Sequence, residues 1–373
     1  MTTQSVADGR TAFIEQSLHV GDPVADAVIV ELDEFGAAGR RLLNEGLRGG
    51  LASLADAPPA IAALLRESEA TPDWVDTERL AAGETAFLSV EPLWTQIVLS
   101  VGSLLPGYST PRIARVLTGT GRLVNTTQRR LQETGKWLNS VTLPGGMLPG
   151  APGYVDTVQV RLMHARVRAT NMRHGWDTGA LGVPINQADV ARTWLDFTYS
   201  PFIALEKLGV TFTDEELLGL YRHWHYVAHL MGVDPVFYRD VVDHQQAGEW
   251  YHAIEAVSDS PDENAVALSS SLLEVVTRML SELALKTPLP LTQDLVAAFA
   301  RRILGDQLCD QLGIAQTDLV PLVDLLAERN AQTRRWQRAS PEAWQQALEE
   351  NIGVRRFLVD LTEGATTYQQ NLA

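Results

Sequence analysis

Histidines are concentrated in one stretch of the chain, residues 158–235, which also carries arginines. Imidazole can bind a metal ion or move a proton near neutral pH, and guanidinium binds anions through paired hydrogen bonds. Many other residues in this stretch are apolar, so we expect several of these nitrogen groups to be buried. Five of the eight histidines lie within it: His164, His174, His223, His225 and His229.

The first cluster is the segment RLMHARVR at residues 161–168. Residues three and four apart share one face of a helix, so Arg161, His164 and Arg168 form one stripe. The imidazole of such a stripe can ligate a metal or haem iron while an arginine binds an anionic group such as a haem propionate. The same residues can also form a polar seam between packed helices. Both interpretations stay open at this point.

The second cluster is RHWHYVAH at residues 222–229. His225 and His229 are four residues apart, the spacing at which two imidazoles on a helix reach one metal ion. A metal site needs at least a third ligand, and no HExxH motif accompanies the pair. A carboxylate from elsewhere, such as Glu249, would have to complete it. His223 falls on the opposite side of the helix, where we expect it at the surface.

Composition argues against several other kinds of protein. A formal charge of -16 and a pI of 4.9 argue against a nucleic-acid partner, because binding phosphates requires a basic surface. The single cysteine, Cys309, excludes an internal disulfide and a thiolate metal cluster. Neither a P-loop, a dinucleotide-binding glycine turn nor a G-x-S-x-G motif is present. The chain has neither a secretory signal pattern nor an apolar run of about 20 residues, so we expect a soluble, cytoplasmic protein without a membrane span.

Helical patterns dominate the chain, and strand patterns are scarce. Asn186, with Asp189 three residues later, predicts the start of a helix over 187–208 that Pro201 should kink or divide. The sequence TDEE at 213–216 is a capping box that opens a helix ending near Gly232. Tryptophans near the two clusters can wall an apolar pocket or belong to an ordinary core: Trp194, Trp224 and Trp250.

The remaining segments fit the same class of fold. The apolar run from Thr85 to Leu105 predicts one buried helix, and residues 142–154, rich in proline and glycine, predict a loop. The C-terminal third has the pattern of amphipathic helices. These patterns together predict an all-α protein that forms a single large domain with an N-terminal extension.

Three motifs in fixed order carry a resemblance to a known family. The segments RLMHARVR, PINQAD and HLMGVDP are similar to those of the latex-clearing protein (rubber oxygenase) and MpaB oxygenase family, over about residues 90–260. The resemblance implies a globin-like helical core that binds b-type haem and uses dioxygen. Rubber oxygenases of this family cleave carbon–carbon double bonds of polyisoprenoids. It also implies an N-terminal helical extension at 1–90, a haem-binding core at 91–260 and C-terminal helices at 261–373 packed on that core.

The resemblance also assigns individual residues. Arg161 falls on the family's arginine beside the haem, and His164 falls near the position where latex-clearing proteins carry a distal lysine. The turn that carries the axial histidine in that family is 193–197 here, and it contains no histidine. The catalytic glutamate expected before the arginine helix has no counterpart, because 144–153 holds no acid, and the nearest acids are Glu133 and Asp156.

These observations give a leading hypothesis, a haem-b-dependent oxygenase or oxidoreductase that acts with dioxygen on a small hydrophobic or aromatic substrate. His164 would be the axial ligand of the iron, with His229 as second choice and His225 as third. Arg161 and Arg168 would bind propionates or a bound oxygen species. The catalytic residues would be Arg161 and His225. His225 or His229 would line the wall of the pocket opposite His164 or donate a proton. Trp194 would contact the cofactor.

Two alternatives remain. One is a haem-free binding or biosynthetic protein that keeps the fold and binds an anionic substrate directly on the stripe of Arg161 and His164. The other is a non-haem metal enzyme that uses His225, His229 and Glu249. The oligomeric state stays open, with a dimer as one option.

Overall fold

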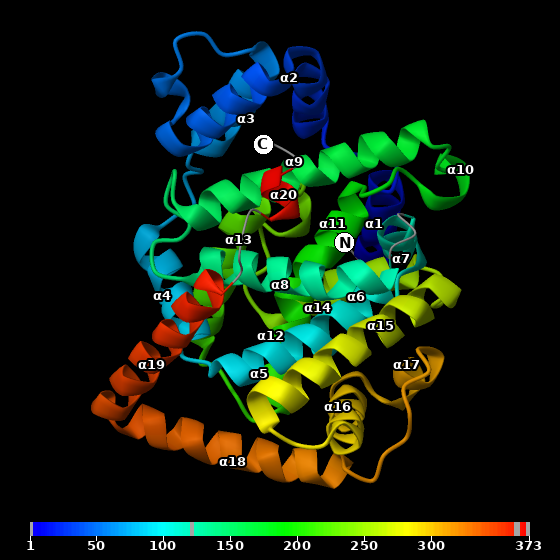
Figure 1. The fold of residues 1–373 in the computed structure, drawn as a ribbon, viewed down its shortest axis with the longest axis vertical. Coiled ribbons are helices and arrows are strands. Elements are labelled where there is room, and N and C mark those ends of the chain that lie inside the picture. The colour runs from blue at the N-terminus through cyan, green and yellow to red at the C-terminus, as the bar shows by residue number, and fades with distance from the viewer. Residues whose placement is uncertain (1–2, 120–122, 362–365, 371–373) are drawn as a thin grey trace.

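The computed structural model describes residues 3–119, 123–361 and 366–370, and every regular element within these ranges is a helix. The all-α prediction is therefore confirmed (Figure 1). The α-helices are α1 (Thr3–Ser17), α2 (Pro23–Gly49), α3 (Pro59–Glu69), α4 (Thr77–Leu88), α5 (Pro92–Ile97), α6 (Leu105–Tyr108), α7 (Pro111–Thr118), α8 (Leu123–Thr142), α9 (Pro152–Arg173), α10 (Thr178–Leu181), α11 (Gln187–Phe197), α12 (Tyr199–Lys207), α13 (Asp214–Leu230), α14 (His244–Ala256), α15 (Glu263–Met279), α16 (Leu289–Leu304), α17 (Asp306–Gln311), α18 (Val320–Ala339), α19 (Pro341–Asp360) and α20 (Thr367–Gln370).

Short 3-10 and π segments complete the chain. The 3-10 turns are η1 (Leu51–Ser53) and η3 (Pro235–Phe237), and the π segments are η2 (Val98–Leu104) and η4 (Leu280–Leu285).

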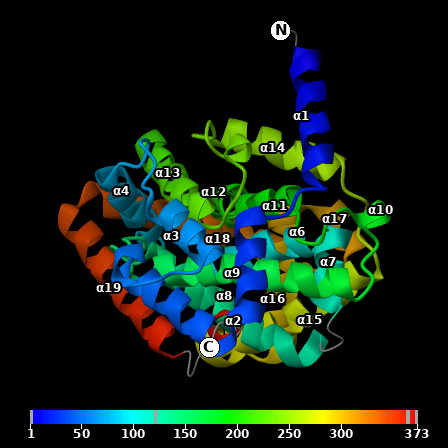
Figure 2. The same ribbon diagram turned by 90° about the horizontal axis from the view of Figure 1, so that it is seen from above.

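Helix α9 lies at the centre of the arrangement that concerns the candidate site. It packs against α2 on one side and against α8 and α13 on another. Figure 1 shows α9 crossing the molecule beneath α2 and α3, and Figure 2 shows α1 projecting beyond the other helices. The first 90 residues contribute α1 to α4, which contact α14, α9 and α13, so this segment covers helices of the central region.

Local capping signals place the helices that carry the motifs. The Asn186 side chain accepts a hydrogen bond from the Asp189 backbone N–H, so α11 begins as predicted. The chain divides at Thr198 between α11 and α12, which confirms the expected effect of Pro201. Thr213 and Glu216 form the predicted capping box at the start of α13. Local side-chain chemistry therefore fixes the starts of these helices.

The prediction of one continuous helix over Thr85–Leu105 is wrong. Helix α4 ends at Leu88, and the chain resumes at Pro92 after a bend of 91°. Glu91 has an extended conformation (φ -56°, ψ 132°), because the ring of a following proline disfavours helical geometry in the preceding residue. Among the described residues, no single helix is long and apolar enough to cross a membrane, although Thr77–Leu88 and Pro92–Tyr108 meet those criteria together as this bent pair.

Helices α4 and α13 are in backbone contact at two glycines. A Cβ atom on Gly83 would lie 2.3 Å from the carbonyl oxygen of Gly219, and one on Gly219 would lie 3.0 Å from the backbone nitrogen of Gly83. Neither atom can move as a flexible side chain could. Glycine at these positions therefore sets how closely the two helices approach.

We predict that Gly83→Ala destabilises the fold by about 2 to 3 kcal/mol, because the added methyl group must push the α13 backbone away. The matched control is Gly353→Ala on α19, where an added Cβ meets nothing within 4 Å and should raise helix stability by up to about 1 kcal/mol. Urea unfolding measures both. Equal stability of the Gly83→Ala variant and the parent protein would contradict the close contact.

Candidate functional site

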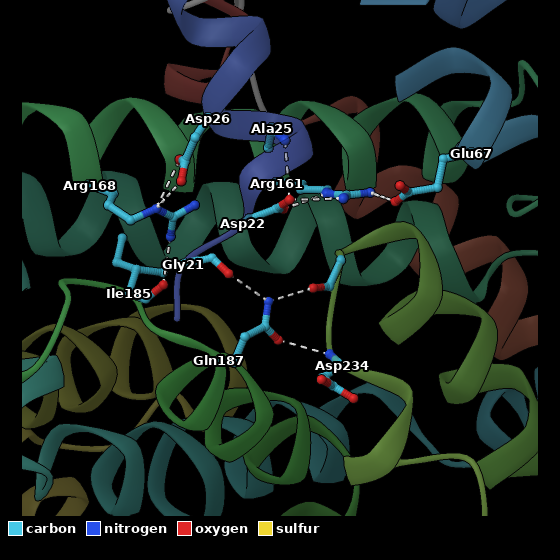
Figure 3. Close-up of polar contacts among 11 residues, drawn as sticks. Gly21, Asp22, Ala25, Asp26, Glu67, Arg161, Arg168, Ile185, Gln187 and Asp234 are labelled. Carbon is cyan, nitrogen blue, oxygen red and sulfur yellow. Dashed lines mark hydrogen bonds and ion pairs between the residues drawn. The ribbon is translucent and has the colours of Figure 1, made fainter. Parts of the chain in front are cut away.

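Arg161 of α9 is held by two acidic side chains from the N-terminal region. Its Nε and Nη2 groups donate to the two carboxylate oxygens of Asp22 at 2.6 and 3.0 Å, and its Nη1 group donates to Glu67 at 2.7 Å (Figure 3). Arg161 and Asp22 are both buried. Asp22 is also the N-cap of α2, because its side chain accepts from the backbone N–H of Ala25. The positive charge of Arg161 is therefore already balanced inside the protein.

Gln187 joins the second and third motifs to the same region. Its Nε2 group donates to the carbonyl oxygens of Gly21 at 3.1 Å and Gly232 at 2.9 Å. Its Oε1 atom accepts from the backbone N–H of Asp234 at 2.8 Å, as Figure 3 shows. PINQAD and HLMGVDP thus meet the residue that precedes Asp22, and the three motifs form one hydrogen-bonded network.

Gly232 has a steric reason to be glycine. Its φ is +74°, and a Cβ atom would lie 2.5 Å from Nε of Arg161 and 2.6 Å from Oδ2 of Asp22. Any side chain at this position would therefore collide with the ion pair.

Arg168 makes a second ion pair one turn along α2. Its Nε donates to Asp26 at 2.9 Å, and its Nη1 donates to the carbonyl oxygen of Ile185 at 2.6 Å. Burial raises the pKa of Asp26, and the charge of Arg168 opposes that rise. An anion at Arg161 would have to displace Asp22 or Glu67, whereas Nη2 of Arg168 is buried without a hydrogen-bond partner.

His164 lies on the same stripe of α9, between the two arginines in sequence. It is half-buried and has no hydrogen bond to another described residue. Burial and the charge of Arg168 lower the pKa of His164 to about 4, and Asp22 opposes the shift. Since the ring is neutral at pH 7, one of its nitrogens keeps a free lone pair that can ligate iron.

Both nitrogens of His225 have hydrogen-bond partners. Nε2 lies 2.7 Å from the carbonyl oxygen of Val241, so it carries the proton, and Nδ1 lies 3.4 Å from Nη1 of Arg222. Burial and the charge of Arg222 lower the pKa of His225 to about 3. At neutral pH this ring is uncharged and has no acidic imidazolium proton, and it could ligate a metal only by losing one of these bonds.

Three predicted site residues meet in one aromatic cluster. His225 and His229 of α13 each contact Trp74 edge-on, with ring centroids 6.0 and 6.4 Å apart. Trp194 of α11 and Tyr238 also contact His225, at 6.0 and 5.5 Å. Nε2 of His229 is buried without a hydrogen-bond partner. The cluster offers an apolar aromatic wall, and nothing in the sequence indicated the roles of Trp74 and Tyr238.

The predicted surface position of His223 is wrong, since its side chain is 1% exposed. Helix α4 covers this face of α13, and a Cβ atom on Gly83 would lie 2.8 Å from Cβ of His223. The close glycine contact between the two helices therefore buries a face that the sequence pattern alone placed in solvent.

The proposed non-haem metal site is not assembled. Glu249 forms an ion pair with Arg10 at 2.9 Å, and both nitrogens of His225 are occupied. Within residues 3–119, 123–361 and 366–370, no group of three histidine, cysteine or acidic residues is arranged to hold a metal ion. This alternative is therefore wrong for the structure described.

An ion pair lies at the turn 193–197, where the resemblance implied an axial histidine. Arg192 binds Asp196 at 3.2 Å and the hydroxyl of Tyr251 at 2.7 Å. Leu195 is completely buried beside them. Burial raises the pKa of Asp196 to about 6, although Arg192 opposes this. The turn is packed by its own side chains and has no histidine to offer as an iron ligand.

Glu84 of α4 is a candidate acid–base group that the sequence did not reveal. Its side chain is 7% exposed and accepts a hydrogen bond from the backbone N–H of Gly145 at 3.3 Å. Burial raises the pKa of Glu84 to about 7, which suits proton transfer at neutral pH. Gly145 lies in the loop before α9, so α4 brings an acid to the segment in which the family resemblance implies one. The sequence signal that could have indicated a buried acid was the position of Glu84 directly before an apolar run.

The two acids nearest in sequence have other partners. Glu133 accepts hydrogen bonds from Thr367, and Asp156 accepts one from Gln369. Both therefore hold the C-terminal segment against α8 and α9.

Comparisons with known proteins agree with the predicted resemblance. The family model described as "ER-bound oxygenase mpaB/B'/Rubber oxygenase, catalytic domain" matches residues 93–338. The chain is 23% identical to the rubber oxygenase of Streptomyces sp. (strain K30) over 303 residues, which are 80% of this chain and 72% of that protein. It also superposes on the latex clearing protein LCP in the closed state with a TM-score of 0.68 and 21% identity, covering 90% of this chain and 91% of the other.

We predict that Glu84 makes stability depend on pH. The folded protein holds this proton up to about pH 7, whereas a glutamate in the unfolded chain releases it near 4.5. The folded state therefore binds more protons between these values, and its contribution, complete below 4.5, is lost as the pH rises through 7. Glu84→Gln should be more stable than the parent by roughly 2 to 3 kcal/mol at about pH 8 and equal to it near pH 4.

Urea unfolding at the two pH values tests this prediction. Glu78→Gln, an exposed acid on the same helix, is the control and should change the pH dependence little. A constant difference between Glu84→Gln and the parent protein at both pH values would show that Glu84 has an ordinary pKa.

Proposed function

The chain belongs to the family of ER-bound MpaB/B' oxygenases and rubber oxygenases, and we propose on this basis that it is an oxidoreductase that uses dioxygen on a small hydrophobic substrate. The observation that carries the proposal is the match of the catalytic-domain model to residues 93–338, which contain Arg161, Gln187 and the histidines of the aromatic cluster. The acidic partners of Arg161 and the ring of Trp74 lie before this range. A cytoplasmic location is part of the proposal.

We further propose haem b as the cofactor, with His164 as the iron ligand. Two observations support this choice: the ring is neutral at pH 7, and it has no competing hydrogen bond among the described residues. His229 is the second choice, because its Nε2 atom is buried and unpartnered, and Trp194 would contribute an aromatic wall. A bound haem would supply the binding and activation of dioxygen.

The protein's own side chains would then have separate tasks. Arg161 would hold α9, and therefore His164, in position through Asp22 and Glu67. Glu84, with a pKa near 7, would accept or return a proton at neutral pH. The neutral ring of His225 would connect α13 to the segment around Val241 through its hydrogen bond and so keep the aromatic cluster in place.

Specific observations favour a second candidate, a haem-free helical protein that binds an organic substrate. The turn that carries the family's axial histidine is filled by Leu195 and the pair of Arg192 and Asp196. The two arginines proposed for propionates are already bound to Asp22 and Asp26. In this second candidate the family fold would persist without its cofactor.

We predict an absorption spectrum with a Soret band for the protein purified from haem-supplemented cells. His164→Ala should lose the band, since it removes the proposed iron ligand, and His229→Ala should keep it. His174→Ala, which changes an exposed histidine at the end of the same helix, is the matched control and should also keep it. Retention of the band in His164→Ala and loss in His229→Ala would move the ligand to His229.

A colourless protein that takes up no added haemin would overturn the haem proposal. Normal binding of a hydrophobic substrate by that colourless protein would then establish the second candidate.

A further inference from the structure

Arg355 of α19 is a buried arginine without an acidic partner. Its side chain is 1% exposed, and no carboxylate of a described residue lies within ion-pair distance. The other buried arginines within the described ranges each lie within 4.0 Å of a carboxylate: Arg112, Arg161, Arg168, Arg192, Arg301 and Arg334. Burying an unpaired charge is strongly unfavourable, so this exception calls for a counter-charge.

Neutral groups satisfy only part of the Arg355 guanidinium. Nη2 donates to the carbonyl oxygen of Val90 at 3.0 Å and to Oγ1 of Thr95 at 2.8 Å, and Nη1 lies 3.3 Å from Oδ1 of Asn139. The guanidinium carbon lies 4.8 Å from the ring centre of Phe87. Nε remains buried without any partner. These contacts orient the group but do not neutralise its charge.

Arg355 lines a cavity with mainly apolar walls. The cavity has a volume of about 40 Å³ and is bounded by residues of α5, η2, α8, α11 and α19, including Leu99, Leu138 and Phe197. A water molecule needs at least about 10 to 15 Å³ of such space, so the volume matches a carboxylate group and not a whole cofactor. Burial lowers the pKa of Arg355 to about 9, which leaves it positively charged at pH 7.

An exposed apolar stripe begins at the rim of this cavity. Leu358 lines the cavity and is 38% exposed, and Val354 and Leu361, on the same face of α19, are 46% and 56% exposed. Phe357, beside them, is 60% exposed. Helix α19 lies at the edge of the molecule in Figure 1, with α4, α5 and α8 on its inner side. A hydrocarbon chain that leaves the cavity past Leu358 would cover this stripe.

We propose that the cavity at Arg355 binds an amphipathic organic carboxylate, with its carboxylate against the Arg355 guanidinium and its hydrocarbon tail along Leu358 and the exposed stripe of α19. The negative charge of the ligand would neutralise the unpaired Arg355, and its hydrocarbon tail would bury the exposed apolar surface of α19. None of the cavity residues belongs to the Arg161 network or the aromatic cluster. The site does not depend on the proposed oxygenase activity, and binding can be measured without turnover.

The direct test is calorimetric titration of the full chain with octanoate, 1-octanol and acetate at neutral pH. Octanoate should bind at least about tenfold more tightly than 1-octanol, because the alcohol cannot form charge-assisted hydrogen bonds with Arg355. Acetate should bind at least about tenfold more weakly than octanoate, because it lacks the tail that buries apolar surface.

Two glycine variants separate this cavity from other surfaces. Gly135 of α8 lines the cavity, and an added Cβ there meets nothing within 4 Å. The longer side chain of Gly135→Leu should therefore occupy space that the ligand needs. We expect it to weaken octanoate binding at least about tenfold. Gly353→Leu adds the same side chain at an open position on α19 outside the cavity and should leave the affinity unchanged.

Arg355→Met, with its melting temperature checked, should abolish the preference for octanoate over 1-octanol. Failure of octanoate to bind, equal affinities for octanoate and 1-octanol, or unchanged binding in Gly135→Leu would each overturn the proposal. If Arg355→Met does not fold, the ligand series and the two glycine variants decide the question.

Discussion

The ion pair of Arg161 with Asp22 is the contact on which the rest of the arrangement depends. It ties the middle of α9 to the N-cap of α2, and Glu67 of α3 accepts a further hydrogen bond from Arg161. Gln187 holds the residue before Asp22 and the turn after α13 together, and this turn passes so close to Arg161 that only Gly232 fits. Removing Arg161 from this buried pair would leave the carboxylate of Asp22 uncompensated.

This arrangement changes how the histidines can act. His164 is an uncharged ring on α9, because burial and the positive charge of Arg168 lower its pKa. The two nitrogens of His225 are hydrogen-bonded to Val241 and Arg222. The interior therefore contains uncharged imidazole rings, together with buried carboxyl groups whose pKa is raised, to about 7 for Glu84 and about 6 for Asp196. This chemistry suits metal ligation and proton transfer in an apolar region, in accordance with membership of an oxygenase family.

Whether a feature could be predicted from the sequence depends on how far apart along the chain the interacting residues lie. The capping signals at Asn186 and Thr213 act over three residues, and their helices begin where predicted. The partners of Arg161 lie 139 and 94 residues away, so its stripe was left open between a cofactor site and a polar seam. His223 was misplaced because the face that α4 covers is decided by glycines on two distant helices. Glu84 was missed because its loop partner is 61 residues away.

Arg161 and Asp22 form a structural ion pair between α9 and the start of α2 and are not free groups awaiting a ligand. A double-mutant cycle with Arg161→Gln, Asp22→Asn and the double variant, measured by urea unfolding, tests it most directly. If this ion pair is structural, Arg161→Gln leaves the buried carboxylate of Asp22 without its partner, and Asp22→Asn leaves Arg161 with Glu67 alone. The coupling energy should then be at least about 2 kcal/mol. Additive effects, within about 0.5 kcal/mol, would contradict the account.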